Sequence, residues 1–164
     1  MKNFDPKYND IPKTEIHIHL EGSIRTQTII DVAKEHNLQL PSYEVSELDK
    51  HVKIYEQMSS LQAVLEAFAI FQNSIASADV VERIAWELFE DSAKQNIKLF
   101  EVRFSPDWAF HGHGLDWDEC LEGLVRAKVR AEAEFVRVED GGVVKAPLEN
   151  VCGVQASGGH PQFA

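Results

Sequence analysis

The fold is decided by residues 13–20, which read Lys-Thr-Glu-Ile-His-Ile-His-Leu. Polar and apolar residues alternate strictly along this stretch, which predicts a β-strand because successive strand side chains point to opposite faces. His17 and His19 therefore share one face with Glu15, and the apolar residues form the other face. A glycine-containing turn at residues 21–23 ends the strand. We expect the apolar face to pack under helices and the histidine face to line an interior.

A second stretch with the same alternation, residues 97–104, predicts a second strand. Glu101 and Arg103 share its polar face, and Pro106 predicts an exit loop directly afterwards. We expect Arg103 to form an ion pair with Glu15 between the two strands.

Apolar residues with helical spacing mark the segments between and after these strands. Asp79 and Glu82 have the spacing of a capping box at the start of one helix. The predicted helices cover residues 26–36, 60–75, 79–95 and 118–135. Strand, helices, strand and helix in this order are typical of a parallel α/β architecture. Two strands cannot close a sheet, so we expect the chain to form part of a larger fold.

Composition divides the chain into three regions. Residues 1–12 form a polar lead-in, residues 13–135 carry the strands and helices, and residues 136–164 are rich in glycine and lack periodicity. We therefore expect the last region to be a disordered tail.

Charge and cysteine content argue against several classes of function. Acidic residues outnumber basic ones by 27 to 16, and the net charge of −11 disfavours binding to nucleic acids and to anionic membrane surfaces. The chain has two cysteines, no signal-peptide core and no apolar stretch long enough to span a bilayer. These features predict a cytoplasmic protein without a disulfide framework.

The two histidines of the first strand carry the strongest chemical signal. Two imidazoles directed to one point form a partial clamp for zinc, which accepts nitrogen ligands readily. The alternative interpretation is a pair of surface histidines on an edge strand. His111 and His113 are interpreted as solvated loop histidines, because no ligand pattern surrounds them. Cys120 is interpreted as a small buried hydrophobic residue, because no partner base is evident.

Longer strings around both strands favour the zinc interpretation. Residues 13–24, Lys-Thr-Glu-Ile-His-Ile-His-Leu-Glu-Gly-Ser-Ile, resemble the first signature of the adenosine and adenine deaminases. Residues 101–106, Glu-Val-Arg-Phe-Ser-Pro, resemble a second signature of this family, in the family's order along the chain. The resemblance covers about residues 11–135.

The resemblance implies the N-terminal part of a TIM-type (β/α)8 barrel in a zinc-dependent hydrolase. Members of the family deaminate adenine or adenosine to hypoxanthine or inosine and release ammonia. By match to the family motif, His17 and His19 would be ligands of one Zn2+ ion, and the partner would be a small-molecule purine.

The resemblance also implies where the substrate binds. Glu21 matches the acidic position that contacts the end of the substrate remote from the amine. Adenosine-preferring members commonly have Asp there, so Glu21 is closer to the adenine deaminases. Leu61, Leu65 and Phe68 match residues that wall the purine pocket. An ordinary amphipathic helix that buries this stripe in the core is an equally good interpretation.

Several parts of the family's machinery have no match in the sequence. The third histidine ligand, the general-acid Glu and the Asp pair are missing, so no catalytic residue is identified. A complete barrel needs at least about 200 residues, whereas this chain has 164. We expect an incomplete barrel from a truncated, fused or frame-shifted product that is inactive alone, and exposed barrel edges that favour self-association. Two alternatives stay open: a non-catalytic binding module of the same ancestry, and another barrel-type metal-dependent hydrolase.

Overall fold

The computed structural model describes residues 5–55, 58, 60–105, 109–110, 113–135, 138–139 and 142–143. Its helices and strands, in chain order, are η1 (Pro6–Asn9), β1 (Lys13–His19), η2 (Glu21–Ser23), α1 (Thr26–His36), α2 (Val45–Val52), α3 (Leu61–Asn73), α4 (Ala78–Lys94), β2 (Ile97–Arg103), α6 (Trp117–Phe135), β3 (Val138–Glu139) and β4 (Gly142–Val143).

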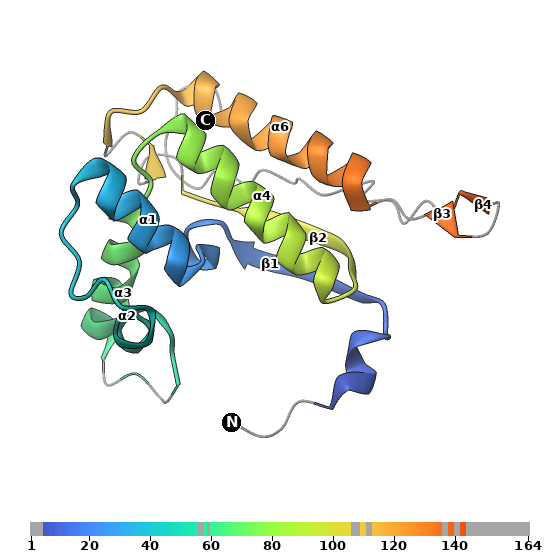
Figure 1. The fold of residues 1–164 in the computed structure, drawn as a ribbon, viewed down its shortest axis with the longest axis horizontal. Coiled ribbons are helices and arrows are strands. Elements are labelled where there is room, and N and C mark those ends of the chain that lie inside the picture. Colours follow the sequence, from blue (N-terminus) through green and yellow to red (C-terminus); the bar gives the residue numbers. More distant parts are fainter. Residues whose placement is uncertain are drawn as a thin grey trace.

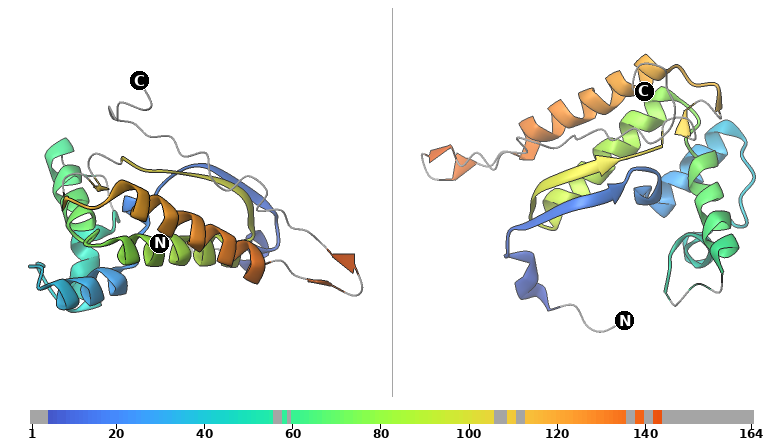
Figure 2. Two further views of the ribbon diagram at one scale, coloured as in Figure 1. Left: turned by 90° about the horizontal axis from the view of Figure 1, so that it is seen from above. Right: turned by 180° about the vertical axis from the view of Figure 1, so that it is seen from behind.

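The main sheet is a parallel pair of strands, β1 and β2, with helices packed along one side. α4 and α6 lie side by side on the same face of this pair, as both views of Figure 2 show. α1, α2 and α3 gather near the carboxyl end of β1 (Figure 1). The predicted parallel α/β order of elements is therefore confirmed.

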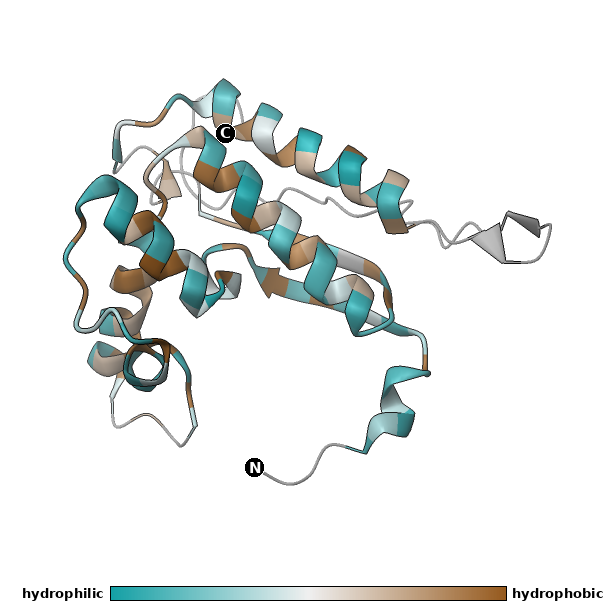
Figure 3. Cartoon of the chain, viewed as in Figure 1, coloured by the Kyte–Doolittle hydropathy of each residue, from teal (hydrophilic) through white to brown (hydrophobic). Residues whose placement is uncertain are grey.

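The core lies where the helices meet one another and the strands. α1 contributes Ile29, Ile30 and Val32, and α4 contributes Val81 and Ile84, all at most 1% exposed. Figure 3 shows hydrophobic residues along one side of these helices and hydrophilic residues along the other. The helix predicted for residues 26–36 is confirmed, and its apolar residues face the core.

Three details of the predicted helices are wrong. α4 is capped by Ser77, whose Oγ accepts a hydrogen bond from the backbone N–H of Val80 (3.2 Å), so the cap precedes Asp79. α2 was not predicted, because its eight residues bury only Leu48 and Val52, too few to define a period. α3 ends two residues earlier than predicted, at Asn73.

The apolar face of β1 is covered only near its end. Leu20, directly after the strand, is 1% exposed, but Ile16 is 61% exposed. The prediction that this face packs under helices is thus wrong for Ile16, because α4 lies against β2 and against α6.

The region 136–164 contains regular structure that the sequence did not predict. β3 and β4 pair antiparallel there through Val138 with Val143 and Glu139 with Gly142. Two-residue strands are too short for a periodic pattern to reveal. The rest of this region lies outside the described residues.

Among the described helices, no single one is long and apolar enough to cross a membrane. α3 and α4 reach that length and composition only together, with a bend of 115° between them.

Ion pairs join α1 and its flanking residues to α4. Arg25 Nη2 lies 2.6 Å from Asp91 Oδ1, and Arg83 Nη2 lies 2.7 Å from Asp31 Oδ2. The hydrogen bond from Arg83 lowers the pKa of Asp31, and the hydrogen bond from Arg25 lowers the pKa of Glu90.

Acidification is expected to destabilise the chain through these carboxylates. A carboxyl group whose pKa is lowered by folding contributes stability above its unfolded pKa of about 4, and that stability is lost as the pH falls through the folded pKa. We expect the urea midpoint to change little between pH 7 and 5 and to fall steeply below about pH 4. In the variant Arg83→Gln the urea midpoint should fall less steeply with decreasing pH than in the wild type. The same pH dependence in both proteins would contradict the role of the Arg83–Asp31 pair.

Candidate active site

The carboxyl ends of β1 and β2 meet at one end of the sheet. His19 pairs in register with Arg103, and the backbone N–H of Leu20 donates to the carbonyl of Arg103 (2.9 Å). Parallel pairing therefore brings the two signature segments of the sequence together at the end of the sheet where barrel enzymes place their active sites.

His17 and His19 lie next to each other, as the strand period predicted. Their ring centroids are 5.4 Å apart and their planes are inclined by 39°. The His17 side chain is exposed and the His19 side chain is 43% exposed, so both are accessible to a ligand. A protein zinc site commonly uses four ligands, and imidazole nitrogen is a common one, so the chemistry of this pair suits two of the four.

Glu21 is buried directly beside this pair, with its residue 3% exposed. Its Oε1 accepts a hydrogen bond from the backbone N–H of Ser105 (2.6 Å). Its Oε2 is buried, has no hydrogen-bond partner among the described residues and lies 3.9 Å from Nδ1 of His19. A buried carboxylate oxygen without a donor is costly, because desolvation is not repaid. This oxygen is therefore ready to accept a hydrogen bond from a ligand.

The turn that carries Glu21 is fixed from both sides. Ser23 Oγ donates to the carbonyl of His19 (2.6 Å), which closes η2 back onto the end of β1. A Cβ atom at Gly22 would lie 4.0 Å from the ring of Phe68, so α3 passes close to the turn. The structure thus brings Phe68 near Glu21.

Leu61 and Leu65 occupy the same side of α3 as Phe68 by their four- and three-residue spacing. They are 73% and 44% exposed, so the core does not contain them. The interpretation of this stripe as an ordinary core face is wrong for these two residues. The buried positions of α3 are Ala67 and Phe71 instead.

A hollow of about 400 Å³ lies between η2 and the helices, lined by residues that include Ile24, Arg25, Val52 and Phe71. Its lining contains neither histidine of β1 nor Glu21, so it is separate from the histidine pair. Within the described residues, no group of three His, Cys, Asp or Glu side chains could hold a metal ion. His17 and His19 form a pair of neighbouring imidazoles at this end of the sheet.

Two residues of β2 and its exit were not among the predicted site residues. Ser105 contributes its backbone N–H, and a backbone donor cannot be recognised from the type of residue in the sequence. Arg103 was predicted to pair with Glu15, and that prediction is wrong: its Nη2 donates to the carbonyl of Ile16 (3.1 Å). Glu15 instead accepts from the backbone N–H of His17 (2.9 Å).

The remaining candidates from the sequence lie away from this site or outside the described residues. Cys120 is fully buried in α6, and burial raises the pKa of its thiol to about 11, which fits a hydrophobic residue rather than a nucleophile. His113 is exposed, as expected of a loop histidine, and His111 lies outside the described residues.

Comparison with known proteins places these features in a family. The family model described as adenosine deaminase matches residues 12–145. An adenosine deaminase from Vibrio vulnificus is 41% identical over 128 residues, which cover 78% of this chain and 38% of that protein. The chain thus spans well under half the length of this curated relative.

Solved structures confirm the predicted fold class. An amidohydrolase from Burkholderia ambifaria, solved with bound Zn, superposes with a TM-score of 0.67 at 18% identity and covers 91% of this chain and 36% of that one. An adenine deaminase from Arthrobacter aurescens gives a TM-score of 0.65 at 21% identity, over 76% of this chain and 36% of that one. The α/β arrangement matches part of their barrel. With the family model matching most of its length, the chain belongs to the adenosine deaminase family.

Proposed function

We propose that this chain supplies the zinc-binding and substrate-holding first portion of a purine deaminase site. The complete site would hydrolyse adenine or adenosine to hypoxanthine or inosine and ammonia. The observation that carries the proposal is the free, buried Oε2 of Glu21 beside the histidine pair. Burying a carboxylate oxygen without a hydrogen-bond donor destabilises an apolar core, whereas a polar group of a bound substrate would supply the donor.

His17 and His19 are proposed to hold Zn2+. When bound, zinc lowers the pKa of a coordinated water toward about 7, which makes hydroxide available at neutral pH. The chain's own contribution is geometric, because it places two imidazoles side by side on one strand face, with their ring centroids 5.4 Å apart.

Glu21 is proposed to orient the substrate. Its Oε1 is held by the N–H of Ser105, so the carboxylate cannot rotate away from the site without breaking that hydrogen bond. The free Oε2 would accept a hydrogen bond from an N–H or O–H group of the purine or its sugar.

Leu61, Leu65 and Phe68 are proposed to contact the face of the purine base. The exposure of both leucines supports this role, since apolar side chains outside the core are available to a planar ligand. Phe68 links this surface to the turn that carries Glu21.

The 164 residues alone are expected not to turn over substrate. Catalytic zinc sites normally use three protein ligands and a water, and the described residues provide two. Ammonia release from adenine and adenosine in the presence of zinc measures this directly. Turnover that depends on His17 and His19 would show that other residues of the chain complete the site.

Zinc affinity tests the metal site independently of activity. Competition with a chromophoric chelator should show zinc binding by the chain, weakened at least about tenfold by His17→Ala or His19→Ala, because even outer partners of metal ligands commonly contribute that much. His51→Ala is the matched control, since His51 is an exposed histidine of α2. Equal affinities for all four proteins would contradict the proposed site.

A further inference from the structure

The pairing of β1 with β2 is interrupted beside His17. The register passes from Glu15 opposite Phe100 directly to Ile18 opposite Val102. Two residues of β1, Ile16 and His17, therefore face the single residue Glu101, which is the arrangement of a β-bulge. Bulges occur next to active sites, where they change the direction of a side chain. The bulge here contains one of the two imidazoles of the candidate site.

The peptide group inside this bulge is held by two side chains of opposite charge. Its carbonyl, that of Ile16, accepts a hydrogen bond from Nη2 of Arg103 (3.1 Å). Its N–H, that of His17, donates to Oε1 of Glu15 (2.9 Å). One side chain binds the carbonyl and the other binds the N–H, so together they fix the plane of the peptide that leads into His17, at the point where the register is irregular.

Arg103 is placed for this role by the fold. It lies opposite His19 in the register, at the end of β2, and its side chain is 23% exposed. Its contact with the carboxylate of Glu101 is long at 4.0 Å, and its buried Nε has no hydrogen-bond partner among the described residues. An ordinary surface ion pair would leave the guanidinium free to move, whereas here it reaches back across the strands to a backbone carbonyl.

We propose that Glu15 and Arg103 are positioning residues that set the direction of the His17 imidazole through this peptide. The proposal rests on the proposed role of His17 in metal binding. A free bulge peptide would rotate, and the Cα–Cβ bond of His17 would rotate with it. The two side chains prevent this, in the way that outer partners of metal ligands hold their ligands in place.

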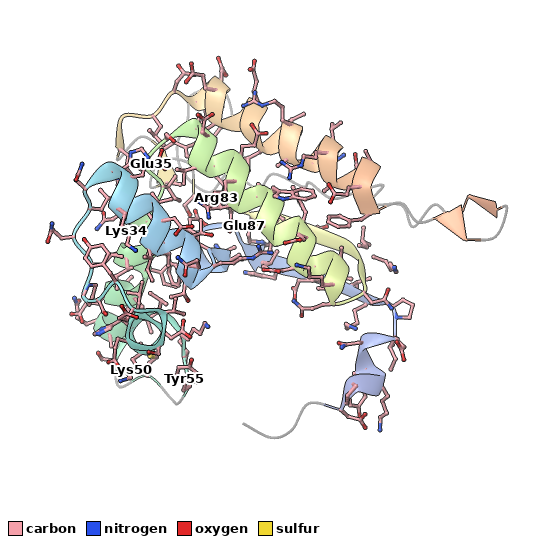
Figure 4. The ribbon with its side chains drawn as sticks, in the orientation of Figure 1. Lys34, Glu35, Lys50, Tyr55, Arg83 and Glu87 are labelled. Atoms are coloured by element: carbon pink, nitrogen blue, oxygen red, sulfur yellow. The ribbon has the colours of Figure 1, made fainter. Side chains whose placement is uncertain are left out.

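Hydrogen exchange tests the contact itself, whatever the metal does. In the 164-residue chain, the His17 amide should exchange about threefold to tenfold faster in Glu15→Ala than in the wild type, because the amide loses its acceptor. Glu15→Gln keeps a side-chain oxygen and should restore most of the protection. Glu35→Ala, at an exposed carboxylate of α1 (Figure 4), is the matched control and should leave this amide unchanged.

Zinc affinity tests the consequence. Glu15→Ala and Arg103→Met should each weaken zinc binding about tenfold or more, whereas Arg126→Met, at an exposed arginine of α6, should not. In a His17→Ala background, Glu15→Ala should cause no further loss, because the residue it positions is gone. In a His19→Ala background, the loss should persist.

The outcomes separate this proposal from the proposed function. Absence of zinc binding by the wild-type chain would contradict the metal site, and the amide exchange would still decide whether the bulge peptide is held. Unchanged exchange of the His17 amide in Glu15→Ala, or equal zinc losses in the presence and absence of His17, would overturn the positioning role.

Discussion

Replacing Phe104 by alanine is expected to lower the free energy of unfolding by about 3–5 kcal/mol, the usual cost of truncating a buried aromatic side chain. The Phe104 residue is 2% exposed, and its ring centroid lies 5.2 Å from that of Phe110 and 6.4 Å from that of Trp117. These three rings join the end of β2 to the start of α6. Removing the central ring leaves a cavity that the strand and helix cannot both close.

Urea denaturation followed by circular dichroism measures this change. Phe104→Leu keeps most of the apolar volume and should cost under about 2 kcal/mol. Val125→Ala, at a residue of α6 that is 57% exposed, should stay within about 0.5 kcal/mol of the wild type. A loss below about 1 kcal/mol for Phe104→Ala would show that the three rings do not act as a packed unit.

The strands and most helices could be predicted because their patterns are local. Strict alternation in residues 13–20 and 97–104 identified β1 and β2, and helical spacing identified α1, α4 and α6. The pairing of two histidines on one face followed from the same alternation. These predictions needed only the geometry of a single strand or helix.

The details that the sequence did not reveal depend on contacts between segments. The bulge at Ile16 and His17 exists only relative to β2, so alternation in β1 alone cannot show it. The expected ion pair between Glu15 and Arg103 assumed a regular strand, and the bulge redirects both side chains to backbone groups.

The exposed side of α3 could not be predicted for a related reason. Periodicity shows that Leu61, Leu65 and Phe68 share a side of the helix, but not whether that side meets the core or an opening. The core takes Ala67 and Phe71 instead. The free oxygen of Glu21 likewise depends on Ser105, whose backbone N–H occupies only one of the two carboxylate oxygens.

A buried polar cluster between α1 and α4 centres on Glu87. Glu87 Oε2 accepts from Thr28 Oγ1 (2.6 Å), and Oε1 accepts from Nε of Arg83 (2.9 Å). Arg83 continues to Asp31 of α1, and Figure 4 shows Arg83 and Glu87 together on α4 where it passes α1. The residues Thr28 and Glu87 are 1% and 8% exposed, so water cannot easily replace these bonds.

Glu87→Ala is therefore expected to destabilise the chain by about 2 kcal/mol, because the buried hydroxyl of Thr28 and the Nε of Arg83 each lose their acceptor. Breaking a fully buried pair costs more, but the Arg83 side chain is 40% exposed and water screens part of its charge. Glu82→Ala is the matched control on α4, since its partner Arg126 is 51% exposed, and should cost under about 1 kcal/mol. Equal losses for Glu87→Ala and Glu82→Ala in urea unfolding would mean that burial adds nothing to the α1–α4 contact.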